Sequence, residues 1–380
     1  MSLQPHRLDA SALAHWWRTV DRGLLATFAM LVVIGIVLVL AAGPASATRL
    51  GIRNAFHFPL RQLAFLAPAI TIVIGVSMLS PLNARRVGAV TFVASLFAMG
   101  LLPFFFGEIN GSTRWISFAG YTLQPSEFLK PGFIIVAAWM LSEKKRDASF
   151  PGLSISMALY GTTMLFLVFQ PDYGQAALLT GIWMVMFFIA GWSVLWLLGI
   201  GATAFGALAF GYMQSNHLQK RINAFLNPGA DGSYQGEKSI EAIATGGLTG
   251  AGGEPVIVKT RLPDSHTDYI FAVAGEQYGF FFCLVIILLF VFFVIRGFGH
   301  AARAQSLFAQ CAIAGLAAQI GLQAFVNMGV SLRALPAKGM TLPFVSYGGS
   351  SMLATALTFG LMLALTRGAR TVRRRREVMA

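Results

Sequence analysis

The stretch LLATFAMLVVIGIVLVLAA, from Leu24 to Ala42, contains no charged residue. A helix needs about 20 mostly apolar residues to cross the hydrocarbon core of a bilayer, so this stretch predicts a transmembrane span. The segment AGPASA that ends at Ala47 resembles a signal-peptidase site. Because the apolar run before it exceeds the roughly 7 to 15 residues of a signal-peptide core, we expect an uncleaved anchor.

The same apolar character continues through the whole chain. Of its 380 residues, 56% are hydrophobic and 11% are charged, and the mean hydropathy is +0.68. These values lie outside the range of soluble domains and predict an all-α integral membrane protein. Windows of about 20 residues predict about ten transmembrane helices. They begin near Leu24, Pro59, Val87, Leu123, Gly152, Gly174, Ser193, Tyr269, Leu307 and Ser346.

The formal net charge of +13 comes mostly from short basic clusters between apolar runs. Such clusters are typical of cytoplasmic loops facing an anionic leaflet, so we expect contact with membrane lipids and no nucleic-acid partner. Both termini are then cytoplasmic, because the opposite orientation would place the terminal RRRR outside. We therefore divide the chain into a cytoplasmic segment (1–22), a polytopic membrane domain (23–367) and a basic cytoplasmic tail (368–380).

Four segments that face the non-cytoplasmic side look unlike simple connectors. They are residues 110–127, residues 170–174, a long loop over 214–267 between the seventh and eighth spans, and residues 332–351. A structureless loop of such length is uncommon unless it is functional. We therefore expect the four segments to converge on one site.

Ionisable residues at the ends of apolar runs are the candidates for this site. Glu127 and Lys130 are three residues apart, so they share a helix face and could form either a structural ion pair or an anion-binding pair beside Arg114 and Trp115. Asp172 could belong to the site or cap the sixth predicted span.

Two further patterns are weak as cofactor motifs. The glycine-rich TGGLTGAGG, from Thr245 to Gly253, matches no nucleotide-binding spacing, so we interpret it as a flexible hinge whose amides could contact a phosphate. Asp264, His266 and Asp268 could form a mixed metal site, although a hydrogen-bonded histidine at the start of a helix is the commoner outcome. No disulfide or metal site is expected from the two cysteines, which lie inside apolar runs.

Asp268 stands where the polar LPDSHTD gives way to an apolar run. It could cap the eighth span, a role that Thr267 could also fill. Alternatively, an aspartate at the membrane surface beside a long loop and an Arg, Lys and Glu group suits a general base acting on a lipid-linked substrate.

Several of these blocks together resemble one family. NGSTRWI with QPSEFLK, QPDYG, LPDSHTDYIFAVAGEQYG and LPFVSYGGSS, in this order from Asn110 to Ser351, are similar to the SEDS family, whose FtsW and RodA members are bacterial peptidoglycan glycosyltransferases. GMTLPF, the acidic LPDSHTD and the GGLTGAGG loop are more similar to division members (FtsW) of alphaproteobacterial type than to elongation members (RodA).

The resemblance implies a polymerase of lipid II in the bacterial inner membrane at the division septum, with the long loop in the periplasm. It implies Asp268 as the general base, and a class B penicillin-binding transpeptidase and other divisome membrane proteins as partners. A divalent cation (Mg or Mn) could assist. The alternatives are a lipid II flippase, a RodA-type elongation polymerase and a non-catalytic scaffold. The predicted substrate-binding residues are Arg114, Trp115, Glu127, Lys130, Asp172, Lys238, His266 and Ser346.

Two departures from the family pattern concern possible site residues. Lys238 stands where members often have Gln, and it could add a contact to a phosphate. Gln277 follows Glu276 where a second acid is common, so a paired acid is not expected there.

Overall fold

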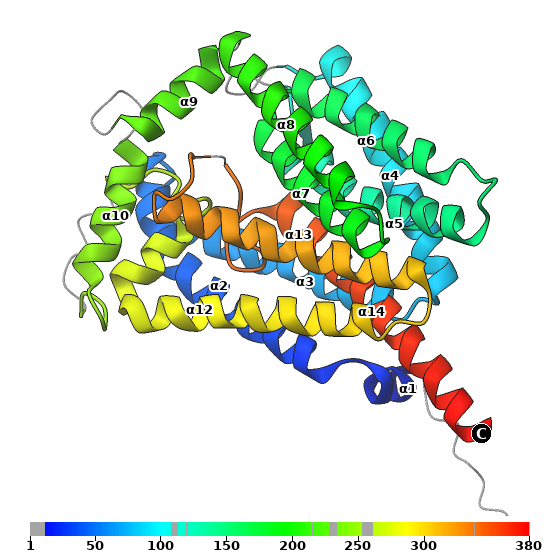
Figure 1. The fold of residues 1–380 in the computed structure, drawn as a ribbon. Helices are drawn as coiled ribbons and strands as arrows, with labels where there is room; N and C mark the ends of the chain where they lie inside the picture. Colours follow the sequence, from blue (N-terminus) through cyan, green and yellow to red (C-terminus); the bar gives the residue numbers. More distant parts are fainter. Residues whose placement is uncertain are drawn as a thin grey trace, which may run out of the picture.

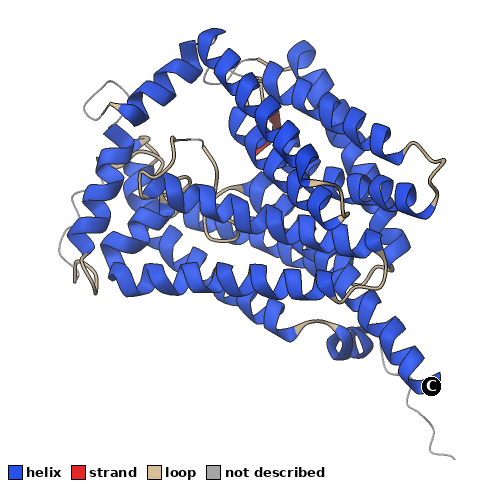
Figure 2. Ribbon diagram, in the orientation of Figure 1, coloured by secondary structure: helices blue, strands red, loops and turns tan. Residues whose placement is uncertain are grey.

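The computed structural model describes residues 12–107, 113–118, 121–214, 216–227, 234–252, 261–337 and 339–379. Their regular structure is helical apart from one short hairpin (Figure 2). The elements are α1 (Ala12–Thr19), α2 (Arg22–Arg49), α3 (His57–Ser77), α4 (Pro81–Phe105), β1 (Ile116–Phe118), β2 (Tyr121–Leu123), α5 (Pro125–Arg146), α6 (Gly152–Phe169), α7 (Tyr173–Ile189), α8 (Val194–Gln214), α9 (Asn216–Leu226), α10 (Tyr234–Gly246), α12 (Ile270–Ala302), α13 (Leu307–Ser331) and α14 (Gly349–Met379).

The predicted spans correspond to helices α2 to α8 and α12 to α14, in chain order (Figure 1). Within the described residues, seven helices are long and apolar enough to cross a membrane: α2, α3, α4, α6, α12, α13 and the first part of α14. Helix α7 and the described start of α8 are shorter apolar helices, and α5 carries ionisable residues near both ends. The chain is an all-α integral membrane protein, as its composition predicts.

Helices α13 and α14 lie inside the bundle. In their most apolar windows, 72% of α13 and 83% of α14 is buried, compared with 22% for α6 and 28% for α12. The outer helices instead expose large apolar side chains such as Phe97, Phe169 and Leu195, which suits surfaces that face lipid. The inner position of α13 and α14 keeps their polar side chains away from lipid, where such groups are costly.

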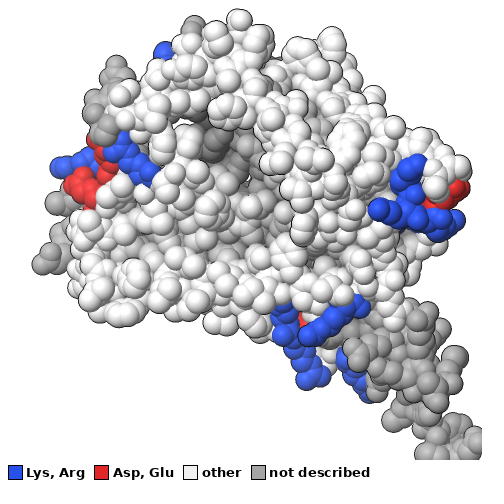
Figure 3. Space-filling model, in the orientation of Figure 1, with Lys and Arg blue, Asp and Glu red and all other residues white. Residues whose placement is uncertain are grey.

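The start of α2 and the ends of α3, α12 and α14 meet at one end of the bundle. Buried Asp21 accepts a hydrogen bond from Arg296 Nε and lies 2.7 Å from His300 Nε2, and Arg367 donates to the Ser77 carbonyl. Figure 3 shows the charged side chains toward the ends of the bundle, with a broad uncharged surface between them. This separation is the one expected of a protein that spans a bilayer.

In the described part of the connection between α8 and α12, the helices α9 and α10 precede the glycine-rich turn. The prediction that this turn is a flexible hinge is wrong for its described residues, 245–252. They pack tightly against a break in α12 at Gly279, where φ is +79°. Phe280 N donates to Gly247 O at 2.9 Å, and a Cβ on Gly250 would lie 2.2 Å from the Gln277 carbonyl oxygen. Only glycine allows so close a backbone approach.

Candidate active site

A cavity of about 470 Å³ lies at the end of the bundle opposite Asp21 and Arg367. All four unusual segments predicted to converge contribute to its walls, together with α3. Within these segments, residues 110–112, 119–120, 215, 228–233, 253–260 and 338 lie outside the described residues. The lining side chains and glycines are Arg61, Phe65, Arg114, Trp115, Thr122, Gln124, Glu127, Asp172, Gln175, Asp264, Thr267, Asp268, Gly339, Thr341, Tyr347, Gly348, Gly349, Ser350 and Ser351.

Arg114 holds the hairpin segment against the turn between α6 and α7. Its Nε donates to the Gln170 carbonyl at 2.7 Å, its Nη2 donates to the Pro171 carbonyl, and its Nη1 lies 3.8 Å from Asp172 Oδ1. Much of its donor capacity is therefore used within the protein, while the side chain still lines the cavity beside Trp115. Arg114 thus places positive charge at this wall in a fixed geometry.

Asp172 has both of the roles considered for it from the sequence. It is the N-cap residue of α7, where its carboxylate accepts a hydrogen bond from Gln175 N, and it lines the cavity. Burial raises the pKa of the Asp172 carboxyl, and the nearby Arg114 guanidinium opposes this shift. The Asp172 carboxylate both caps α7 and faces Arg114, so it connects the wall of the cavity to the start of this helix.

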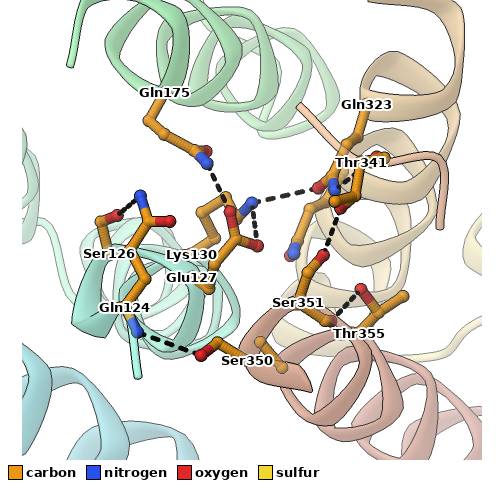
Figure 4. Close-up of polar contacts among 12 residues, drawn as sticks. Gln124, Ser126, Glu127, Lys130, Gln175, Gln323, Thr341, Ser350, Ser351 and Thr355 are labelled. Carbon is orange, nitrogen blue, oxygen red and sulfur yellow. Dashed lines mark hydrogen bonds and ion pairs between the residues drawn. The ribbon is translucent and has the colours of Figure 1, made fainter. Parts of the chain in front are cut away.

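Glu127 and Lys130 form a buried ion pair at the base of the cavity (Figure 4). Lys130 Nζ lies 2.8 Å from Glu127 Oε2 and 3.0 Å from Gln323 Oε1, and Gln175 Nε2 donates to Glu127 Oε1. Glu127 lines the cavity, whereas the Lys130 side chain is only 2% exposed and does not. The spacing of three residues predicts the pair correctly, and the side chains of α7 and α13 complete its hydrogen bonding.

Asp268 also lines the cavity, on the loop that leads into α12. Tyr269 occupies the N-cap position of α12, so the capping alternative for Asp268 is wrong. The Asp268 carboxylate lies beside Gly339, because a Cβ built on that glycine would be 3.7 Å from Asp268 Oδ2. The structure thus brings the predicted base into one cavity with Glu127 and Arg114.

His266 and Ser346 support the Asp268 loop and do not line the cavity. The buried ring of His266 packs between Phe58 and Tyr347, with centroid distances of 4.1 and 5.5 Å. Burial lowers the pKa of His266 to about 4, so this imidazole is neutral at pH 7. Ser346 Oγ donates to the Thr267 carbonyl at 2.6 Å, which ties this loop to the segment before α14.

Lys238 is also absent from the cavity walls. It lies on α10, where its Nζ is 2.5 Å from Glu241 Oε2 and also faces the ring of Tyr234. A contact with a phosphate therefore requires a substrate that extends from the cavity to α10, and this role stays a prediction.

No group of three or more His, Cys, Asp and Glu side chains suited to a metal ion occurs in the part of the chain that the structure describes. Asp264 and Asp268 line the cavity, but the ring of His266 is packed between aromatic side chains and does not join them. The residues therefore do not fit the mixed site considered from the sequence, and we derive no chemistry through a metal.

Several polar residues at the cavity are not evident from the charged motifs. Arg61 on α3 and Gln175 on α7 line the walls, while Gln323 and Asn327 on α13 lie behind them. The signal for the α13 residues is their spacing, since Gln319, Gln323 and Asn327 recur every four residues in an apolar run and must share one helix face. Arg61 has no comparable local signal.

Sequence comparison shows similarity along nearly the whole chain. A family model for FtsW, RodA and SpoVE, described as "Cell cycle protein", matches residues 22–371. A Caulobacter vibrioides protein named "Probable peptidoglycan glycosyltransferase FtsW" is 43% identical over 361 residues, which cover 95% of this chain and 93% of that protein. A protein of the same name from Geobacter metallireducens is 35% identical over 354 residues, covering 90% and 93%.

Solved structures show a similar fold. A chain from "Structural coordination of polymerization and crosslinking by a peptidoglycan synthase complex" has a TM-score of 0.76 and 27% identity, covering 92% of this chain and 98% of that chain. The Thermus thermophilus rod shape determining protein RodA has a TM-score of 0.69 and 25% identity, covering 93% and 98%.

Proposed function

Because the chain belongs to the FtsW, RodA and SpoVE family of cell cycle proteins, we propose that it is a peptidoglycan glycosyltransferase of the FtsW type, acting in septal cell-wall synthesis. The family resemblance predicted from the sequence blocks is confirmed. The alphaproteobacterial character is confirmed as well, because Caulobacter is an alphaproteobacterium. The substrate that we infer is lipid II, and the assignment of residues below is part of the proposal.

The observation that carries the proposal is the position of Asp268. It lines the same polar cavity as Glu127 of the buried ion pair, at the end of the bundle away from the basic chain terminus. We assign this end to the periplasmic surface of the inner membrane and both termini to the cytoplasm, because the basic clusters favour that orientation. A carboxylate at this surface can reach a sugar whose lipid tail remains in the bilayer.

In the proposed reaction, Asp268 removes the proton from the 4-hydroxyl of the N-acetylglucosamine of lipid II. The oxygen attacks C1 of the muramyl unit at the reducing end of the growing strand, with inversion, and the bond to undecaprenyl pyrophosphate breaks. A positioned general base contributes roughly 10² to 10⁴-fold in rate. The proton moves to the Asp268 carboxylate, and the electron pair of the broken bond leaves with the pyrophosphate.

The leaving pyrophosphate requires positive charge near the cavity. Arg114 supplies it directly at the wall, and the role that we propose for Lys130 is to offset the negative charge of Glu127, which also lines the cavity. Preorganised charges of this kind stabilise a transition state because they need no reorientation during the reaction. Trp115 and Asp172 complete this wall.

The partner that we propose is a class B penicillin-binding transpeptidase, which would cross-link the strands made here, within a set of divisome membrane proteins. The similar fold of a chain from "Structural coordination of polymerization and crosslinking by a peptidoglycan synthase complex" supports such a pairing.

The test is the substitution Asp268→Asn in the purified protein, with its transpeptidase partner present. The amide keeps the shape but is a far poorer base, so polymerisation of lipid II in detergent should fall on the order of 100-fold or more while the folded amount is unchanged. Asp264→Asn, also on the cavity wall, is the matched control and should lose much less.

Near-normal polymerisation by Asp268→Asn would refute the general-base role. Detergent abolishes the two sides of a membrane, so a flippase makes no product in this assay. An unsubstituted protein that forms no polymer in detergent but moves lipid II across vesicle membranes would favour the transport alternative.

A further inference from the structure

One buried amide on α13 joins the two segments that form the Asp268 side of the cavity. The Asn327 side chain donates from Nδ2 to the Asp268 carbonyl at 2.8 Å and to the Met340 carbonyl at 2.6 Å. An amide nitrogen carries two hydrogens, so both are directed at these carbonyls. Asn327 is 1% exposed, and water therefore has little access to compete for either bond.

Gln323 lies one helical turn earlier, on the same face of α13. Its Nε2 donates to the Thr341 carbonyl at 3.1 Å, and its Oε1 accepts from Lys130 Nζ at 3.0 Å (Figure 4). The two α13 amides therefore hold the successive carbonyls of Met340 and Thr341. Gln323 also connects this segment to the buried ion pair through its bond from Lys130.

The segment from Gly339 to Thr341 also lies next to the Asp268 carboxylate. Gly339 and Thr341 line the cavity, and a Cβ at Gly339 would lie 3.7 Å from Asp268 Oδ2. Since Asn327 bonds the backbone of both Asp268 and Met340, it sets the distance between the carboxylate and this wall. A shift of about 1 Å at a reacting group can reduce a rate by as much as 100-fold.

We propose that Asn327 is a positioning residue, which fixes the carboxylate of Asp268 relative to the substrate in the cavity. The proposal rests on the general-base role of Asp268. Asn327 does not line the cavity, so it acts through Asp268 and does not itself touch the substrate.

Gln319 provides the matched control on the same helix face. It is buried, with 2% exposure, and its Nε2 donates to Thr358 Oγ1 at 3.1 Å, between α13 and α14 and away from the cavity. A substitution there removes a buried amide from the same helix without affecting Asp268. It therefore measures what the loss of a polar contact between packed helices does by itself.

The experiment compares Asn327→Leu, Gln319→Met and Asp268→Asn in the full chain with its transpeptidase partner, using lipid II in detergent. We expect Asn327→Leu to lower kcat at least about tenfold per folded molecule while KM changes less than about threefold, because the base is displaced and the substrate contacts remain. Gln319→Met should keep kcat within about threefold. Folded protein is quantified by size-exclusion chromatography before each assay.

The double variant Asn327→Leu with Asp268→Asn separates positioning from general damage. If Asn327 acts through Asp268, its loss should not lower the residual rate of Asp268→Asn any further, because residues that act as a unit are non-additive. A normal kcat in Asn327→Leu, equal losses in Asn327→Leu and Gln319→Met, or a further fall in the double variant would overturn the proposal. Near-normal activity of Asp268→Asn would instead refute the proposed base, so the two failures are distinguishable.

Discussion

The buried ion pair between Lys130 and Glu127 allows the stability of the site to be predicted in magnitude. Its charged atoms are 2.8 Å apart, and their side chains are 2% and 8% exposed. With an effective dielectric constant of about 20, Coulomb attraction at this distance is about 6 kcal/mol. Removing one charge loses this attraction and leaves the other charge buried. The hydrogen bond that Glu127 accepts from Gln175 limits the net cost, so we expect a loss of about 3 to 5 kcal/mol for Lys130→Met.

Removing both charges should cost less than removing one. In the double variant Glu127→Gln with Lys130→Met, no uncompensated charge remains, and Gln175 and Gln323 still border the site. We expect this variant to lose less than about 2 kcal/mol, because neutral replacements of buried pairs are often close to neutral in stability. Arg146→Met at the other end of α5, where the side chain is 80% exposed, is the control and should change stability by less than about 0.5 kcal/mol.

The measurement is unfolding in detergent, followed by the loss of the monodisperse chromatographic peak with denaturant or heat. A Lys130→Met variant within about 1 kcal/mol of the unsubstituted protein would refute the argument, as would a double variant less stable than Lys130→Met. Polymerisation by the folded double variant then separates the two interpretations of the pair. We expect at least about a 100-fold loss if the charges act on the pyrophosphate, whereas retained activity would leave a purely structural pair.

Three further predictions concern topology, backbone packing and pH. In the proposed orientation, a cysteine at exposed Asn227 should react with a membrane-impermeant thiol reagent in intact spheroplasts and one at exposed Lys145 only after lysis; the reverse pattern would invert the orientation. Gly250→Ala should lower the unfolding free energy by about 2 kcal/mol or more, because φ is +97° and the new Cβ would lie 2.2 Å from a backbone oxygen. Gly199→Ala, whose Cβ would have no atom within 4 Å, should not be destabilising. Equal melting temperatures for the two variants would contradict the packing argument. The pKa of His266 is about 4 in the folded protein and 6.5 when exposed, so between these pH values the unfolded chain binds one more proton than the folded chain. The unfolding free energy should therefore fall by roughly 3 kcal/mol as the pH decreases from 6.5 to 4. His266→Phe should lack this pH-dependent loss, and identical pH profiles for the two proteins would refute the argument.

The properties that the sequence predicts well are those that depend on neighbouring residues. A run of apolar residues identifies a membrane helix wherever it occurs, and the predicted spans therefore agree with the observed helices. The Glu127–Lys130 pair follows from a spacing of three residues on one helix, and the cap at Asp172 follows from its place before α7. The Asp268 cap is the instructive failure, because the helix begins one residue later than its sequence suggests.

Tertiary structure decides which side chains face the cavity and which stand behind it. Gln323 is 193 residues from its partner Lys130, and Asn327 is 59 residues from Asp268, so no local spacing relates them. His266 and Ser346 belong to the blocks that identify the family, yet folding turns them away from the cavity to pack against aromatic rings and backbone. Hydropathy determines that a segment enters the membrane, because transfer from water depends on each residue's own chemistry. The direction of a side chain inside the bundle depends on how the helices pack, and packing is a property of the whole chain.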